Sequence, residues 1–180
     1  MKKLLAILPV VLLSACSLKS PVYQPSLKNV QALNNSDVQQ VNVGAVTSAP
    51  ALNQISLRGS KMMSHVGSGY GDYLKAALTE ELKLAKLYSA VSSRVVEAEL
   101  MQNDIDVTGF STGDGIIEAK FTVTENGEVK YEKALSAKNE FESSFVGAIA
   151  IPNAQNSYVG LVQNLLNQLF TDPEFIAAIK

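Results

Sequence analysis

The chain is poor in the residue types on which most enzyme and metal sites depend. Its 180 residues include one cysteine, one histidine, no tryptophan and only two arginines, Arg58 and Arg94. A single cysteine cannot form an internal disulfide, and together with one histidine it falls short of the four ligands of a structural zinc site. Few arginines and no basic stripe argue against nucleic acid, whose binding depends on neutralising phosphates. We therefore expect no metal, no cofactor and no nucleic-acid partner.

The sequence also lacks a catalytic constellation. His65 would have to serve any nucleophile–histidine pair, and the nearby hydroxyl groups belong to Ser60, Ser64 and Ser68. Residues so close in sequence do not usually face each other as the members of a triad do, and no Gly-x-Ser-x-Gly elbow occurs. We therefore predict that the protein is not an enzyme and that His65 lies in an exposed loop.

Two further patterns have ordinary structural interpretations. Asp104 and Asp106 alternate with apolar residues, which favours a solvated strand face over a weak Ca²⁺ site. The glycine-rich segment 67–71 lacks the spacing of a phosphate-binding loop and is expected to be a flexible turn into a helix.

The amino terminus carries a distinctive signal. Lys2 and Lys3 precede an apolar run over residues 4–13, the pattern of a secretory signal peptide. The run is too short to cross a bilayer of about 30 Å as a helix. Residues 13–16 (Leu-Ser-Ala-Cys) closely resemble the bacterial lipobox, whose cysteine is diacylated on sulfur and, after cleavage, acylated on nitrogen. The resemblance implies cleavage between Ala15 and Cys16 and lipidation of Cys16.

Lipidation of Cys16 implies a location in the bacterial envelope. One acyl chain gives only marginal membrane attachment, whereas two or three chains on one residue hold it essentially permanently. Ser17 follows the cysteine where lipoproteins retained in the inner membrane usually carry Asp. By that sorting rule we expect the periplasmic side of the outer membrane, with the inner membrane as the alternative.

Hydrophobic patterning predicts a single α+β domain behind this leader. Residues 1–15 form the signal peptide, and residues 16–40, rich in Ser, Asn, Gln and Pro, are expected to be a lipidated N-terminus and flexible tether. Residues 41–180 then form the domain. We expect a mainly antiparallel sheet of about four strands, with two main helices on one face and a short C-terminal helix.

The periodicity places the elements of that domain. Alternating apolar and polar residues predict strands over 41–46, 95–110, 116–124 and 128–141. Asn126-Gly127 between the last two is the strongest hairpin signal in the chain. Leucine spacing predicts helices over 73–87, capped by Asp72, and over 157–170. Asp172-Pro173 should start the short final helix, and 49–71 is expected to be a long loop with a short strand near 55–57.

The segment 145–152 (Phe-Val-Gly-Ala-Ile-Ala-Ile-Pro) is an uncharged apolar octamer without a clear period. One interpretation is a buried crossover strand. The other is an exposed apolar lip that contacts a partner, because exposed apolar patches usually mark contact sites. Its candidate contact residues are Phe145, Val146, Ile149 and Ile151.

The order of these features is similar to that of small uncharacterised proteobacterial lipoproteins of the YajG type. The resemblance lies in the lipobox, the helix 73–82 after a glycine-rich loop, the Asn126-Gly127 hairpin and the apolar helix 161–170. It implies a fold like the N-terminal domain of the periplasmic Tol translocation protein and like the lipoprotein plug of the lipopolysaccharide translocon. It also implies a non-catalytic accessory role in the envelope.

Two functions remain open at this point. The first is an interaction lipoprotein that binds an unidentified envelope protein through a sheet edge or through the segment 145–152. The second is a binding module for a small apolar or lipidic ligand held between the sheet and the helices. The second function requires a hollow apolar pocket in place of a packed core.

Overall fold

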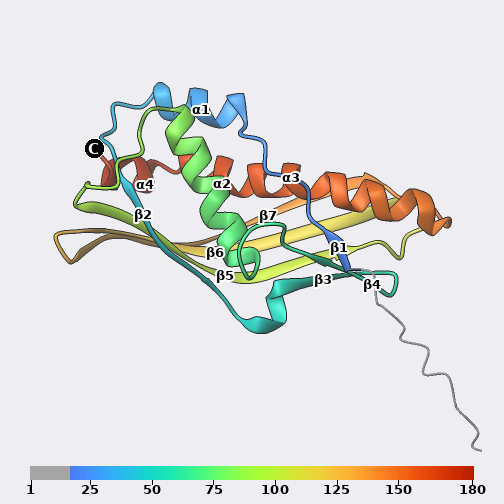
Figure 1. The fold of residues 1–180 in the computed structure, drawn as a ribbon. Coiled ribbons are helices and arrows are strands. Elements are labelled where there is room, and N and C mark those ends of the chain that lie inside the picture. The colour runs from blue at the N-terminus through green and yellow to red at the C-terminus, as the bar shows by residue number, and fades with distance from the viewer. Residues whose placement is uncertain (1–16) are drawn as a thin grey trace, which may run out of the picture.

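The computed structural model describes residues 17–180, which form two β-sheets and a layer of helices (Figure 1). The leader, Cys16 and the predicted cleavage site lie outside the described residues. The elements follow in the order β1 (Ser17–Lys19), α1 (Leu27–Asn34), β2 (Asn42–Ser48), the 3₁₀ turn η1 (Pro50–Asn53), β3 (Gln54–Leu57), β4 (Ser60–Met63), α2 (Tyr70–Leu84), β5 (Arg94–Asp106), β6 (Thr112–Glu125), β7 (Glu128–Glu142), α3 (Gly147–Thr171) and α4 (Pro173–Ala178).

The main sheet has the strand order β2-β5-β6-β7. In β6 the odd-numbered residues from Gly113 to Val123 are buried, and the residues between them are partly or fully exposed. This alternation turns one face of the sheet toward the helices and leaves the other face to solvent. The predicted α+β domain, with a sheet of four strands, helices on one face and a short C-terminal helix, is confirmed.

One strand pairing in the main sheet is parallel. β5, β6 and β7 are antiparallel neighbours, whereas β2 pairs with β5 in parallel. A parallel pair needs a long connection, and the chain between β2 and β5 contains the second sheet and α2. The hairpin between β6 and β7 turns at Asn126 and Gly127, whose φ angles of 51° and 84° are those of the predicted tight turn.

The predicted loop 49–71 contains most of a second, smaller sheet. β3 and β4 form an antiparallel hairpin, and β1 adds to β4 in parallel, with Ser17 opposite Lys61. Only the strand near 55–57 was predicted from the sequence. β1 and β4 have three and four residues, which is too short for a period-two pattern to be recognised.

The N-terminal segment is folded onto the domain. β1 and α1 lie within it, and the side chains of Tyr23, Val30 and Leu33 are buried in the core. The prediction of a flexible tether over 16–40 is therefore wrong for residues 17–40. The segment is polar in composition, but its few apolar side chains and its hydrogen bonds find partners on α2 and α3.

The helices begin earlier than the leucine pattern predicts. α2 starts at Tyr70, so Asp72 lies in its first turn, where its carboxylate accepts a 2.7 Å hydrogen bond from the backbone N–H of Ser68. α3 starts at Gly147 and includes Pro152. The end of α3 and the start of α4 follow the prediction, because the Asp172 carboxylate accepts from the Glu174 N–H at 2.9 Å and Pro173 occupies the first helical position.

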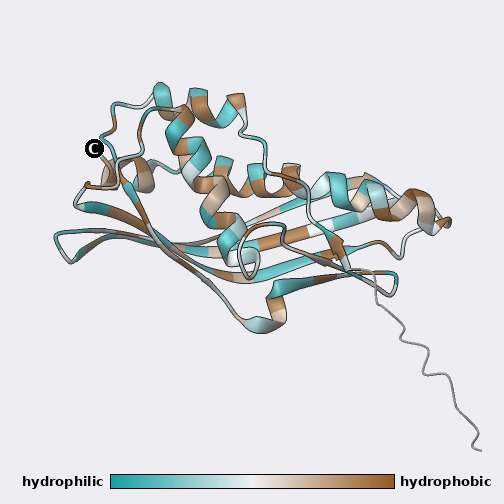
Figure 2. Ribbon diagram, in the orientation of Figure 1, coloured by the Kyte–Doolittle hydropathy of each residue, from teal (hydrophilic) through white to brown (hydrophobic). Residues whose placement is uncertain are grey.

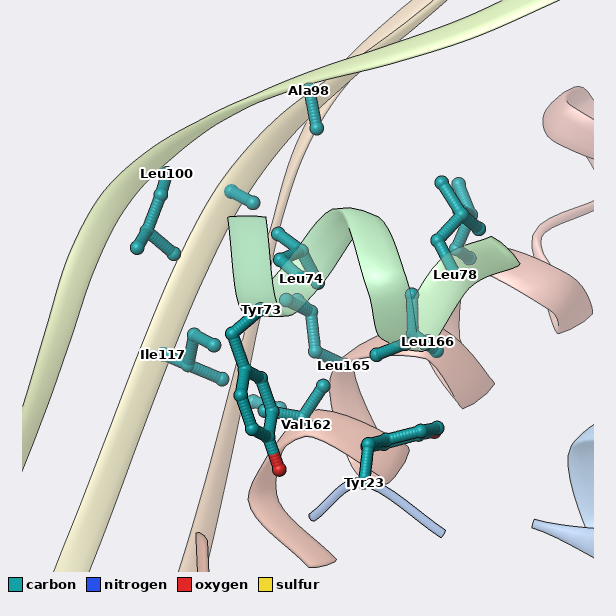
Figure 3. Close-up of a cluster of buried hydrophobic side chains, with 14 of the residues drawn as sticks. Tyr23, Tyr73, Leu74, Leu78, Ala98, Leu100, Ile117, Val162, Leu165 and Leu166 are labelled. Carbon is teal, nitrogen blue, oxygen red and sulfur yellow. The ribbon is translucent and has the colours of Figure 1, made fainter. Parts of the chain in front are cut away.

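Side chains fill the space between the main sheet and the helices (Figure 3). Tyr73 and Leu74 of α2 meet Leu165 and Val162 of α3 there, beside Ile117 of β6. Each of these side chains is at most 1% exposed. Such packing contradicts the hollow pocket that a ligand-binding module between sheet and helices requires.

Candidate functional site

The start of α3, coloured as hydrophobic in Figure 2, and the loop between β5 and β6 lie at one end of the main sheet and carry exposed apolar side chains. Phe110 and Phe145 are 79% and 76% exposed, and Val146 and Ile149 are 51% and 50% exposed. The two phenylalanine rings stack with their centroids 5.9 Å apart and their planes 10° apart. We call these four residues the apolar lip.

The structure decides between the two interpretations of segment 145–152. A buried crossover strand is wrong, because the segment forms the entry and first turns of α3. Ala150 and Ala154 face the core, which turns Phe145, Val146 and Ile149 outward. Ile151 is half-buried and packs against the core, so it does not belong to the exposed set.

Phe110 was missed as a lip residue because the sequence placed it at the end of a strand. β5 ends at Asp106, and Phe110 lies in the loop that follows. The available signal was the Gly109 beside it and the run Ser-Thr-Gly after it, which indicate a loop in place of a strand. Its contact with Phe145 joins loops 35 residues apart, and no local pattern predicts it.

Arg58 holds the loops of the lip together. It occupies the tight turn between β3 and β4 with a φ of 49°. Its Nε donates to the carbonyl of Val107 at 2.8 Å, its Nη1 to that of Phe145 at 2.8 Å and its Nη2 to that of Gly109 at 3.4 Å. Within residues 17–180 no carboxylate lies within ion-pair distance of Arg58. Its positive charge therefore remains at the base of the lip.

Cys16, the predicted lipidation residue, directly precedes β1, which lies at this end of the molecule. Ser17, the residue after Cys16, pairs with Lys61, which is three residues from Arg58. Three residues span at most about 11 Å, and paired strands lie about 5 Å apart. In Figure 1 the described chain begins at the end of the domain where α3 starts. None of the helices in residues 17–180 is long and apolar enough to cross a membrane.

His65 makes contacts that fit a structural role. Its backbone N–H donates to Ser20 Oγ at 3.2 Å, and its ring Nδ1 lies 3.3 Å from the same oxygen. The ring packs edge-on against Tyr73, with centroids 5.6 Å apart. Ser20 is 4% exposed and follows β1, so the contact fastens the N-terminal segment to the end of β4. Among residues 17–180, no carboxylate forms a hydrogen bond with the His65 ring.

Ser64 and Ser68, close to His65 in sequence, bond to other groups. Ser64 Oγ donates to the carbonyl of Val66 at 2.6 Å, and Ser68 Oγ donates to the Asp72 carboxylate at 3.1 Å. Neither hydroxyl is hydrogen-bonded to the imidazole. The described residues thus contain a serine–histidine contact, through Ser20, without the carboxylate that orients the ring in a triad.

The solvent face of the main sheet carries an acidic hollow. Its lining includes Asp104, Asp106 and Asp114, with Lys138 beside them. Hydrogen bonds from Thr108 lower the pKa of Asp106 below its ordinary value. No group of three or more His, Cys, Asp or Glu side chains in residues 17–180 is placed to hold a metal ion. The hollow is an exposed, charged surface, consistent with the solvated strand face expected from the sequence.

Comparison with known proteins identifies the fold. No family model matches the chain, and no curated protein matches it in sequence. The structure is similar to that of a Xanthomonas campestris protein assigned to the family DUF330, with a TM-score of 0.63 and 10% identity, over 90% of this chain and 96% of that one. It is also similar to a candidate lipoprotein from Caulobacter crescentus, with a TM-score of 0.50 and 11% identity, over 83% of this chain and 96% of that one. At these identities the likeness shows a shared fold.

Proposed function

We propose that the protein is a lipoprotein of the YajG type, anchored through acylated Cys16 at the periplasmic side of the outer membrane. It acts there as a non-catalytic accessory protein for another envelope protein. The position of the only cysteine carries this proposal, because Cys16 directly follows the predicted signal peptide and directly precedes β1. The C. crescentus protein of the same fold is itself described as a candidate lipoprotein.

The anchor is tested by labelling the full chain and its Cys16→Ser variant with radioactive palmitate during expression in a Gram-negative bacterium. We expect label only in the native chain, which should float with membranes in a density gradient. Separation of the two membranes should place it in the outer one, and Ser17→Asp should move it to the inner one. A native chain that takes up no label would refute the lipoprotein assignment.

The open edge of β7 offers the simplest mode of partner binding. β7 pairs with β6 along one side, and no described strand pairs with its other side. Two of its carbonyls accept hydrogen bonds from α3, that of Ser136 from Gln168 Nε2 at 2.7 Å and that of Glu142 from Asn153 Nδ2 at 2.9 Å. A partner strand could add to this edge through main-chain hydrogen bonds. Lys130, Lys133 and Lys138 lie along β7, and such charges suppress non-specific pairing between exposed edges.

The partner is tested by photo-crosslinking in living cells. A photoreactive amino acid at Ala134, an exposed position of β7, should yield one discrete protein adduct. The same amino acid at Lys75, an exposed position of α2, serves as the matched control and should not. Adducts with lipid alone from both positions would contradict a protein-binding role for the β7 edge.

A further inference from the structure

We propose that the apolar lip inserts into the phospholipid surface to which Cys16 attaches, so that the domain lies against the membrane in one orientation. The proposal rests on the acylation of Cys16 and therefore on the function proposed above. It assigns the lip to lipid, whereas the β7 edge remains available for a protein.

No linker residue separates Cys16, the proposed acylation site, from the first strand of the described domain. β1 begins at Ser17, and the chain after it is fixed by the N–H of Ser20, which donates to the Met63 carbonyl at 2.8 Å. Lys19 Nζ donates to the carbonyl of Ser64 at 3.2 Å. Since one residue spans at most about 3.6 Å, acyl chains on Cys16 would hold this edge of the domain at the membrane surface.

The apolar lip lies close to β1. Gln155 of α3 donates through Nε2 to the carbonyl of Lys19 at 3.0 Å. Ile149 precedes Gln155 by six residues, which corresponds to about 9 Å along a helix. The first turns of α3 are therefore beside β1, and a membrane that receives the acyl chains also meets the lip.

The surfaces that would enter the headgroup region are uncharged and partly aromatic. Residues 107–113 and 143–171, which include both loops of the lip and all of α3, contain no charged side chain. Charged groups are expensive to place in a bilayer, whereas aromatic rings prefer its interface. The lip offers two stacked phenylalanines, and Arg58 at its base is suited to phosphate oxygens.

The acidic hollow on the solvent face of the sheet favours the same orientation. Asp104, Asp106 and Asp114 line it, and anionic headgroups repel such carboxylates. Docking through that face would also require charged groups to lose water. The lip loop lies between Asp106 and Asp114 in sequence but carries no charged side chain itself, so the lip is the part of this end that enters the headgroup region without either penalty.

The experiment uses the lack of tryptophan in the chain. Phe145→Trp places a single reporter in the lip. Val91→Trp is the matched control, because Val91 is 93% exposed and lies just before β5, at the far end from the lip. The thirteen residues of β5 separate the two ends by about 40 Å. Each full-length lipidated variant is reconstituted into vesicles of phosphatidylethanolamine and phosphatidylglycerol, with and without bromine on the acyl chains.

Brominated lipid should quench most of the emission of Phe145→Trp and shift the remaining emission to shorter wavelength, and it should leave Val91→Trp unchanged. Protein that floats with the vesicles while Phe145→Trp is unquenched would overturn the proposal and leave the lip to a protein partner. Equal quenching of both reporters would overturn the single orientation. Protein that does not float at all would refute the anchor itself. If Phe145→Trp alters the circular dichroism of the protein, Phe110→Trp supplies the same measurement.

Discussion

Replacement of Glu81 by alanine should undock the N-terminal segment and destabilise the whole domain. Glu81 lies in α2 and is fully buried. Its Oε1 accepts hydrogen bonds from the Tyr23 hydroxyl at 2.7 Å, from the Ser26 N–H at 2.9 Å and from Asn29 Nδ2 at 3.0 Å. All three donors belong to the segment before β2, so one oxygen connects that segment to α2.

The magnitude follows from the donors that would lose their acceptor. A buried donor without a partner costs about 1–3 kcal/mol. The Tyr23 hydroxyl and Asn29 Nδ2 lie in buried side chains, whereas Ser26 is half-buried and is better placed to bond with water. We therefore expect Glu81→Ala to lower the free energy of unfolding by about 3–5 kcal/mol, including the cavity left by the side chain. This is a large part of the roughly 5–15 kcal/mol that stabilises a typical protein.

Urea unfolding followed by circular dichroism measures this loss, with Glu80→Ala as the matched control. Glu80 is the neighbouring residue, is half-exposed and pairs only with Lys83, so its replacement should cost less than about 1 kcal/mol. Limited proteolysis should cut Glu81→Ala before residue 40 and leave the native protein intact there. Equal stability of the two variants, or equal protease resistance of the segment, would refute the role given to Glu81.

Four further predictions concern the β6–β7 turn, α3, the start of α4 and the core. Gly127→Ala should destabilise by about 1 kcal/mol because its φ of 84° strains an L-residue, whereas Gly160→Ala, inside α3 with open space at its Cβ, should stabilise by roughly 0.5–1 kcal/mol in the same urea assay. Burial alone would raise the pKa of Asp172, but hydrogen bonds from Lys133, the Glu174 N–H and Tyr131 outweigh it and lower that pKa. Asp172 therefore stabilises the folded state above its unfolded pKa of about 3.9, and the stability difference from Asp172→Asn should shrink as pH falls through the folded pKa. Leu165→Ala should cost about 3–5 kcal/mol, since Leu165 is fully buried, and a loss below 1 kcal/mol would contradict the tight packing.

The sequence predicts the long amphipathic elements well. β5, β6 and β7 have 13, 14 and 15 residues, so their alternation is repeated often enough to be recognised. Asn126-Gly127 sets the turn through local conformational preference alone. In these elements the hydrophobic pattern, the turn residues and the final packing all favour the same structure.

The N-terminal segment was not predictable in the same way, because its partners are distant in sequence. Ser17 and Lys61 pair across 44 residues, and Glu81 bonds to donors more than 50 residues away. Nothing local distinguishes such a segment from a polar tether. A serine N-cap at Ser26 before Leu27–Asn34 was the one available sign of a helix.

The sequence predicts the apolar segment of the candidate site but neither its secondary structure nor its exposure. An apolar octamer at 145–152 is visible in the sequence, yet either burial or exposure would account for it. The missing information was the inward spacing of Ala150, Ala154 and Tyr158, which is helical but begins with two small residues. Pro152 in the same stretch further obscured the helix, because proline is unfavourable inside one.

The docked N-terminal segment would change the mechanical effect of the lipid anchor proposed at Cys16. A flexible tether of about 25 residues would have an end-to-end distance of roughly 25–30 Å and would let the domain turn freely. Without that tether, the acyl chains and the apolar lip would together fix two points at one end of the sheet. β7, a strand of 15 residues, begins at Glu128 and ends with Glu142 at that same end. At about 3.3 Å per residue its open edge would extend roughly 50 Å from the membrane into the periplasm. A partner strand added there would be held away from the bilayer in a defined direction, which a tethered domain could not achieve.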